Sequence, residues 1–266
     1  MLHAYGLLIQ PQTDQTALDD SLAYSFPMFQ IFNNLIREAL RYTPLDQTAN
    51  VRQLVDANRV AHLPYCPAPE GDLLHSLIRE NGCRQCLETG FHTGSTALYM
   101  ADAVAGSEGT VTSITIDDDD GIARGMALLE AGGQSGHHRL IRDNNSQVLP
   151  ELLKAGEQFD LIFMDGWKTF DHLAMEMYYF NRLLRRGGVI FFDDAYMPSV
   201  RRAARLLKRY YGYQEVIYNR FNETFRLRLY QILTRASPYR PYWALTKTIE
   251  TGDQIPDQDW NFDRSL

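Results

Sequence analysis

The sequence lacks the marks of several protein classes. No apolar run in its 266 residues is long enough to cross a bilayer, and no cationic, apolar leader opens it, so we expect a soluble, cytoplasmic protein with no membrane partner. The three cysteines are an odd, sparse set. The single Cys83-x-x-Cys86 pair lacks the second Cys or His pair of a zinc site. The net charge of −7 argues against nucleic acid as a partner.

A further absence concerns the glycine turn within residues 85–98. A short apolar run ends in Glu88-Thr89-Gly90, Gly94 follows, and a helix-forming segment begins, which predicts a strand, a tight turn and a helix start. The spacing is Glu-x-Gly-x-x-x-Gly, so the third glycine of the dinucleotide fingerprint is missing and a nicotinamide dehydrogenase is disfavoured. The turn still lets an anionic ligand end approach backbone N–H groups closely.

What the sequence does contain is a regular alternation of apolar strands and helices, with an apolar fraction of 45% that suffices for a sizeable core. After a first strand near Cys86, we predict strands at 110–116, 138–142, 159–164 and 189–192, and a late hairpin from 214–218 and 225–233. The predicted helices lie at 72–81, 97–105, 122–131, 147–155, 173–184 and 198–211. This order predicts an α/β fold with a Rossmann-like, doubly wound, mainly parallel sheet and a C-terminal antiparallel hairpin.

The N-terminal part differs from the rest. Residues 29–40 and 51–60 have helical spacing, and a proline-rich connector at 63–71 follows them. The helix at 29–40 can pack on the main domain or act as a lid over a site, and we favour packing. We therefore expect an N-terminal helical extension or lid over 1–70, a ligand-binding domain over 71–235 and a C-terminal tail over 236–266.

Acidic side chains follow the predicted strands. They are Glu88, Asp117, Asp165, Asp193 and Asp194. Ligands of such sheets bind at the carboxyl ends of the strands, and acids gathered there repel one another unless a ligand compensates them. Asp117 is placed to accept hydrogen bonds from a ribose diol, while Asp165 with Asp193 and Asp194 offers hard oxygen ligands for Mg²⁺ or a similar ion. The alternative is that some of them cap the following helices, as we expect of 118–120.

Two other polar groups have competing interpretations. The amides of Asn144 and Asn145 can read the edge of an adenine, or they can cap the helix that follows, and the sequence leaves both open. The predicted helix at 198–211 carries a basic run. In an acidic protein we interpret this run as a solvated face rather than a phosphate site.

Taken together, the motifs resemble those of class I S-adenosylmethionine-dependent methyltransferases. The motifs are Glu88-x-Gly90-x-x-x-Gly94, Asp117, Asp165-Gly-Trp-Lys168 and Gly187-Gly-Val-Ile-Phe-Phe-Asp193-Asp194. Within that class the chain is similar to metal-dependent small-molecule O-methyltransferases, of the catechol and caffeoyl-coenzyme A type and their antibiotic-tailoring relatives. The resemblance covers about residues 70–235. It implies a seven-stranded sheet, S-adenosyl-L-methionine and a divalent cation such as Mg²⁺ as cofactors, a small hydroxylated substrate and a homodimer.

The resemblance also implies roles for individual residues. Lys168 falls on the general base that takes the acceptor proton, and Asp165 on both a catalytic and a metal-binding position. His172 would be a reserve base if helical spacing put it beside Lys168, or simply a polar helix residue. The remaining assignments are metal binding by Asp193 and Asp194, and cofactor binding by Glu88, Gly90, His92, Thr96, Asp117, Asn144, Asn145 and Trp167.

One departure from the family pattern is the pair Asp193-Asp194, where catechol-type enzymes usually have Asp-Asn. The extra charge would tighten a metal or mark the tailoring subgroup. Two rival functions stay open: a metal-independent methyltransferase of the same fold, and a non-catalytic module that keeps only the cofactor pocket. Metal dependence separates the first from our prediction, and cofactor binding without methyl transfer would favour the second.

Overall fold

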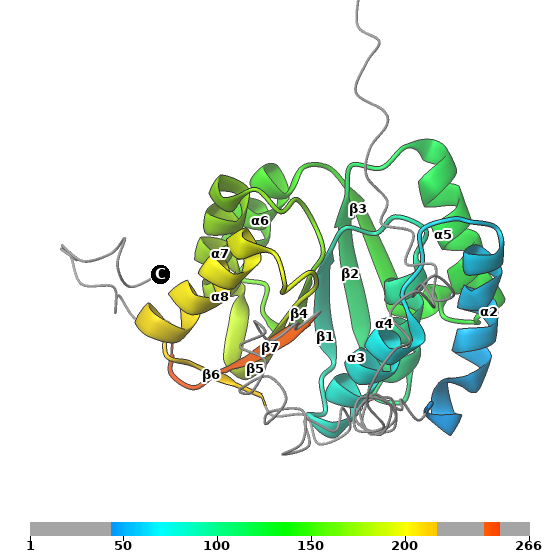
Figure 1. Cartoon of the computed structure of the whole chain (residues 1–266), viewed down its shortest axis with the longest axis horizontal. Coiled ribbons are helices and arrows are strands. Elements are labelled where there is room, and N and C mark those ends of the chain that lie inside the picture. Colours follow the sequence, from blue (N-terminus) through cyan, green and yellow to red (C-terminus); the bar gives the residue numbers. More distant parts are fainter. Residues whose placement is uncertain (1–43, 217–241, 251–266) are drawn as a thin grey trace, which may run out of the picture. The chain divides into compact units, whose positions relative to one another are not determined.

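A seven-stranded sheet forms the centre of the computed structural model, which describes residues 44–216 and 242–250 (Figure 1). The strand order is β3-β2-β1-β4-β5-β7-β6. The strands are β1 (Gln85–Thr89), β2 (Thr110–Thr115), β3 (His138–Arg142), β4 (Phe159–Met164), β5 (Leu184–Phe192), β6 (Tyr213–Glu215) and β7 (Trp243–Lys247). β1 to β5 pair in parallel, and β7 pairs antiparallel with both β5 and β6. The predicted doubly wound, mainly parallel sheet with C-terminal antiparallel strands is confirmed.

Helices cover both faces of this sheet (Figure 1). They are α2 (Ala49–Val60), α3 (Ala68–Glu80), α4 (Ser95–Ala105), α5 (Asp119–Ala131), α6 (Asn145–Lys154), α7 (Phe170–Leu183) and α8 (Pro198–Tyr210). Successive strand side chains point to opposite faces, so Cys86 packs in one core with α2 to α5 and Leu87 in the other with α6 to α8. Within the described residues, none of these helices combines the length and the apolar character that a membrane crossing requires.

The strand order reverses next to β1. From β1 the chain continues through β2 to β3 on one side of the sheet, and then returns to β4 and β5 on the other. The crossovers therefore leave in opposite directions at the carboxyl ends of β1 and β4. In doubly wound sheets this reversal opens a crevice where ligands bind.

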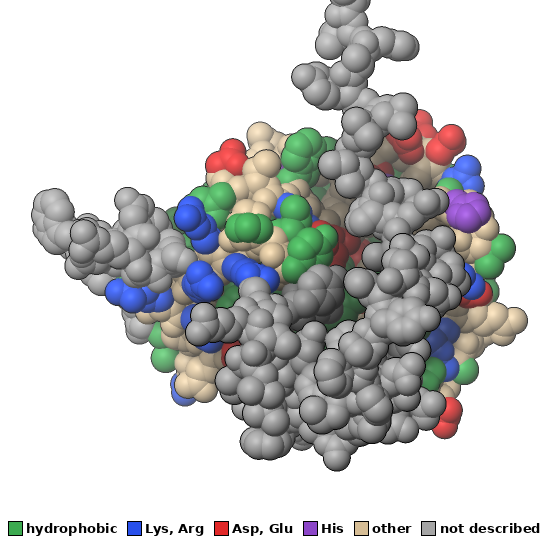
Figure 2. All heavy atoms as spheres, in the orientation of Figure 1, with side chains coloured by type: hydrophobic (Ala, Val, Ile, Leu, Met, Phe, Trp, Pro, Cys, Tyr) green, Lys and Arg blue, Asp and Glu red, His purple; other side chains and the backbone are tan. Residues whose placement is uncertain are grey.

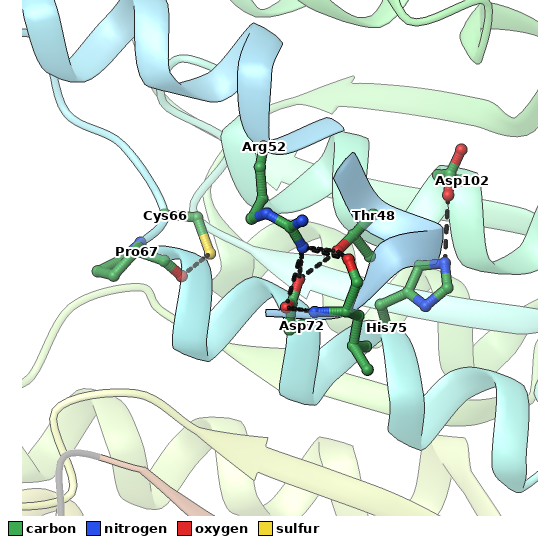
Figure 3. Close-up of polar contacts among 8 residues, drawn as sticks. Thr48, Arg52, Cys66, Pro67, Asp72, His75 and Asp102 are labelled. Carbon is green, nitrogen blue, oxygen red and sulfur yellow. Dashed lines mark hydrogen bonds and ion pairs between the residues drawn. The ribbon is translucent and has the colours of Figure 1, made fainter. Parts of the chain in front are cut away.

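A buried polar cluster fixes α2 on α3 (Figure 3). The carboxylate of Asp72 accepts hydrogen bonds from the backbone N–H of Leu45 at 2.7 Å, from the Thr48 hydroxyl, and from Arg52 Nη1 at 3.2 Å. Because Asp72 is buried, these donors compensate the cost of removing its charge from water. The predicted helix at 51–60 is confirmed, and it packs against the main domain.

Some predicted boundaries were wrong. The helix expected to begin at residue 72 begins at Ala68, because Pro69 in the first turn needs no intrahelical N–H partner. The strand expected at 189–192 begins earlier, because the segment 185–188 also belongs to β5. Residues 243–247, expected in a tail, form β7 and pair with 213–215. The predicted helix at 29–40 and the predicted strand at 225–233 lie outside the described residues.

The basic run on α8 lies on the solvent side of that helix. Arg202, Arg205, Lys208 and Arg209 are exposed, and Figure 2 shows Lys and Arg side chains over this part of the surface. The opposite face of α8 is apolar and packs in the core with α7. This arrangement agrees with the predicted solvated face.

Candidate cofactor and metal site

A cavity of about 300 Å³ lies at the carboxyl ends of β1, β2 and β4, where the strand order reverses. Its wall combines the glycine turn after β1, the end of β2, the start of α6 and the segment after β4. The predicted site residues that line it are Gly90, His92, Asp117, Asn144, Asn145, Asp165, Trp167 and His172. The fold thus brings together residues that are up to 82 positions apart in the sequence (172 − 90).

The glycine turn depends on both of its glycines. Gly90 has φ +94°, and a Cβ there would lie 2.6 Å from the backbone oxygen of Asp165. Gly94 has φ +71°, and a Cβ there would lie 2.8 Å from the Cα of Gly125. Any other residue would be strained at either position, because the backbone is left-handed and a neighbouring part of the chain lies too close. The two glycines therefore let the turn pack closely against the backbone after β4 and against α5.

Asp117 holds this turn in place. Its Oδ2 accepts a hydrogen bond from the backbone N–H of His92 at 2.7 Å and another from the Thr115 hydroxyl. Across the described chain, no residue hydrogen-bonds the other oxygen, Oδ1. The carboxylate can therefore fix the turn with one oxygen and accept from a ligand with the other.

Glu88 lies at the end of β1 with no exposed surface. Its Oε2 accepts a hydrogen bond from Ser113 Oγ at 2.5 Å, whereas its buried Oε1 has no partner among the described residues. Burial raises the pKa of Glu88 to about 8, against the opposing hydrogen bond from Ser113, and the charges of Asp165 and Asp117 raise it further. A buried, half-satisfied carboxyl of this kind favours a cationic or hydrogen-bond-donating ligand beside it.

Three carboxylates meet beyond the ends of β4 and β5. One oxygen each from Asp165, Asp193 and Asp194 lies within 4.8 Å of the others. Burial raises the pKa of Asp193 to about 7, with the charges of Asp165 and Asp194 acting in the same direction. Hard oxygen ligands at this spacing are suited to Mg²⁺ or a similar ion. The three acids therefore converge as the strand pattern predicted.

Lys168 supplies positive charge to this cluster. Its Nζ lies 2.9 Å from Asp165 Oδ1 and 3.7 Å from Asp194 Oδ2. Burial lowers the pKa of Lys168, but the charges of Asp165 and Asp193 outweigh it, so that the pKa lies above its ordinary value. Lys168 thus compensates part of the negative charge of the triad.

The sequence analysis missed Glu70, a fourth acid at this cluster. It lies buried in the first turn of α3. Burial raises its pKa well above the ordinary value, and the charges of Asp193 and Asp165, with a hydrogen bond to Asp193, raise it further. Placing residues 63–71 in a connector hid this position. Pro69 as a marker of a helix start was the signal that could have found it.

The other end of the cavity is built by α6 and α7. Asn144 caps α6, because its Oδ1 accepts a hydrogen bond from Ser146 N at 2.9 Å. Asn145 is buried, and its Nδ2 donates to Glu176 at 2.7 Å. Trp167 is exposed at the rim, where a flat ligand can pack on its ring. Both asparagines therefore line the cavity, and Asn144 also caps α6.

Two predicted site residues lie differently from the expectation. Thr96 is in the first turn of α4 beside Cys66 and does not line the cavity. His172 does not share a helical face with Lys168, because α7 begins at Phe170, after Lys168. Its Nε2 lies 3.5 Å from Glu176, and that hydrogen-bonding partner raises the pKa of His172 against the opposing effect of burial.

Residues 87–195 match a family model described as "Methyltransferase domain". No curated protein sequence matches the chain. Solved structures with similar folds include cofactor-bound Rv0187 from MTB, with 19% identity and a TM-score of 0.58, covering 82% of this chain and 97% of that one. The O-methyltransferase TomG from Streptomyces achromogenes, solved with SAM, has 18% identity and a TM-score of 0.53 over 82% and 96% of the two chains.

A third similar structure is the O-methyltransferase from Bacillus cereus in complex with SAH. It has 20% identity and a TM-score of 0.52, and the match covers 77% of this chain and 92% of that one. These likenesses concern the fold, and the family match concerns the segment from β1 to the residues just after β5. Residues 87–195 are thus similar to a methyltransferase domain, and the chain has the fold of these solved structures.

Proposed function

We propose that this chain transfers a methyl group from S-adenosylmethionine to a hydroxyl group of a small molecule. The observation that carries the proposal is the position of Asp165. This residue lines the cavity at the strand reversal and also belongs to the carboxylate triad with Lys168. A donor in the cavity and an acceptor at the triad would therefore meet at one residue, as a direct transfer requires. The names of TomG and of the Bacillus cereus protein favour oxygen as the accepting atom.

The cavity offers suitable partners for each part of the donor. Asp117 Oδ1 can accept hydrogen bonds from the ribose hydroxyls. The unsatisfied Oε1 of Glu88 can accept one from the ammonium group of the methionine part. Asn145 suits the adenine edge and Trp167 its flat face. The backbone turn at Gly90 excludes side chains from the space between them. Together these residues would orient the donor with its methyl group toward the triad.

Asp165, Asp193 and Asp194 would hold the divalent cation. Mg²⁺ or a similar ion supplies Lewis acidity that lowers the pKa of an acceptor hydroxyl. Among the chain's own groups, the carboxylates keep the pKa of Lys168 raised. Once their charge is compensated, the burial of Lys168 would dominate and lower its pKa, so that Lys168 can accept the proton of the hydroxyl.

A chelator experiment tests the metal-dependent part. We expect methyl transfer to a panel of phenols and catechols to be lost with EDTA and restored by Mg²⁺, and we expect Asp193→Asn to lower kcat by at least about 100-fold. The matched control is Asp120→Asn, which removes the same charge from an exposed position on α5 and should leave kcat within about twofold. Full turnover in EDTA would reject the metal. Donor binding without transfer to any acceptor would favour a non-catalytic module.

One observation favours the metal-independent alternative. The ammonium of Lys168 already lies 2.9 Å from Asp165 and compensates part of the charge of the triad without an ion. In that case Lys168→Met would leave the carboxylates uncompensated and destabilise the fold as well as lower kcat. With a metal in place, the same substitution would lower kcat and leave the unfolding midpoint in Mg²⁺ nearly unchanged.

A further inference from the structure

Glu176 is a buried acid that the proposed chemistry does not use. It lies on α7 with no exposed surface, and Leu173, Met177 and Phe180 on the same helix are fully buried apolar side chains. A carboxyl group in such surroundings costs free energy unless hydrogen bonds compensate it. An apolar side chain of similar volume would suit the packing at least as well. The position of Glu176 therefore calls for a reason other than the stability of the core.

The contacts of Glu176 lead to the α6 end of the cofactor cavity. Its Oε1 accepts a hydrogen bond from Asn145 Nδ2 at 2.7 Å, and His172 Nε2 lies 3.5 Å from the same oxygen. Both Asn145 and His172 line the cavity. Gly166, also in the wall, is close enough that a Cβ there would lie 3.3 Å from Glu176 Oε1 and from Asn145 Nδ2. One buried carboxyl group thus lies beside three neighbouring parts of the wall and hydrogen-bonds one of them, Asn145.

The contact with Asn145 fixes the chemical character of the wall. Asn145 Nδ2 donates to Glu176 Oε1, so the amide nitrogen faces Glu176 and the amide oxygen turns away from it. Without Glu176 the amide could rotate and present either its donors or its acceptor to a ligand. With Glu176 in place, the nitrogen of the amide is held by the core and its oxygen is left to accept from a ligand. The amino group of adenine is a donor, whereas the keto group of hypoxanthine in the same position is an acceptor.

We propose that Glu176 is a positioning residue that makes the cavity selective for adenine, because it holds Asn145 with its oxygen available to the exocyclic amino group. The inference rests on the proposed donor, since it concerns the base of that molecule. It adds a specificity determinant outside the cavity wall itself. Glu176 does not touch the donor and acts through Asn145.

The test compares two ligands by calorimetry: S-adenosylhomocysteine and S-inosylhomocysteine, which differ in the amino and keto groups of the base. The wild type should bind the adenine compound at least about tenfold more tightly. Glu176→Met removes the acceptor at similar volume and should reduce this ratio at least about fivefold. Glu176→Gln, which keeps an acceptor for Asn145, should restore most of it. Glu151→Met, at an exposed position on α6, is the matched control and should leave the ratio unchanged.

Kinetics separate positioning from general disruption. In Glu176→Met the KM for S-adenosylmethionine should rise while kcat at saturation stays within about twofold of wild type. If Glu176→Met does not fold, Asn145→Ala tests the same contact and must lower the same ratio. An unchanged ratio in either folded variant, or an equal loss of affinity for both ligands, overturns the role of Glu176. If the wild type binds neither ligand, the proposed function fails first and the inference fails with it.

Discussion

Gly90 illustrates how a single residue shapes the cavity at the strand reversal. We expect Gly90→Ala to lower the unfolding free energy by about 3 kcal/mol, because alanine would meet both an unfavourable φ and the backbone oxygen of Asp165. The matched control is Gly133→Ala, where φ is +71° but nothing lies within 4 Å of the added Cβ. It should cost about 1 kcal/mol. Urea denaturation measures both, and titration with S-adenosylhomocysteine should show weaker binding only in Gly90→Ala. Equal costs in the two variants would contradict the close approach.

For single residues, the sequence predicted which acids converge on the site better at strand ends than in helices. Asp165, Asp193 and Asp194 follow apolar runs, and parallel strands bring their carboxyl ends to one edge, so local pattern was enough. Glu70 and Glu176 lie in helices, where an acid normally faces solvent. Their burial results from packing between distant elements, and no local spacing encodes it.

Among the elements, α2 depends on one buried carboxylate of α3. Asp72→Ala should lower the unfolding free energy by about 3 kcal/mol, because it leaves Arg52, Thr48 and the N–H of Leu45 without their shared acceptor (Figure 3). Hydrogen exchange should rise first in residues 49–60. Glu130→Ala, at an exposed position on α5, should change stability by less than about 0.5 kcal/mol. Unchanged exchange in α2 would show that its apolar contacts alone hold it.

Element boundaries were predictable where a local signal marked them. The end of β2 and the start of α5 are marked by consecutive acids, and Asp118 indeed caps α5 by accepting from Gly121 N at 2.8 Å. β7 has no such signal. Its five residues, 243–247, form a strand because they pair with β5 on one side and with β6 on the other. Even the nearer of these strands in sequence, β6, ends 28 positions before β7 begins (243 − 215 = 28). Long-range pairing of this kind is invisible in a short sequence window.

At the scale of the whole molecule, a chain of net charge −7 places several acids beside one cavity. The folded state limits their repulsion by holding protons. Glu88 has an ordinary pKa of 4.5, which burial raises to about 8, and Asp193 has one of 3.8, which burial raises to about 7. At a pH between the ordinary and the raised pKa of either group, the folded chain binds more protons than the unfolded chain. The unfolding free energy therefore falls as the pH rises.

We therefore expect the ligand-free protein to melt at a lower temperature at about pH 8 than at about pH 5.5, with Glu88→Gln flattening this slope. Asp120→Asn, which changes an exposed acid, should leave the slope as it is. Because a bound ammonium group compensates Glu88, S-adenosylhomocysteine should raise the midpoint more at the higher pH. Differential scanning calorimetry at both pH values measures all of these. Wild type and Glu88→Gln with the same slope would mean that Glu88 does not hold its proton in the folded chain, and that another group causes the fall in stability with pH.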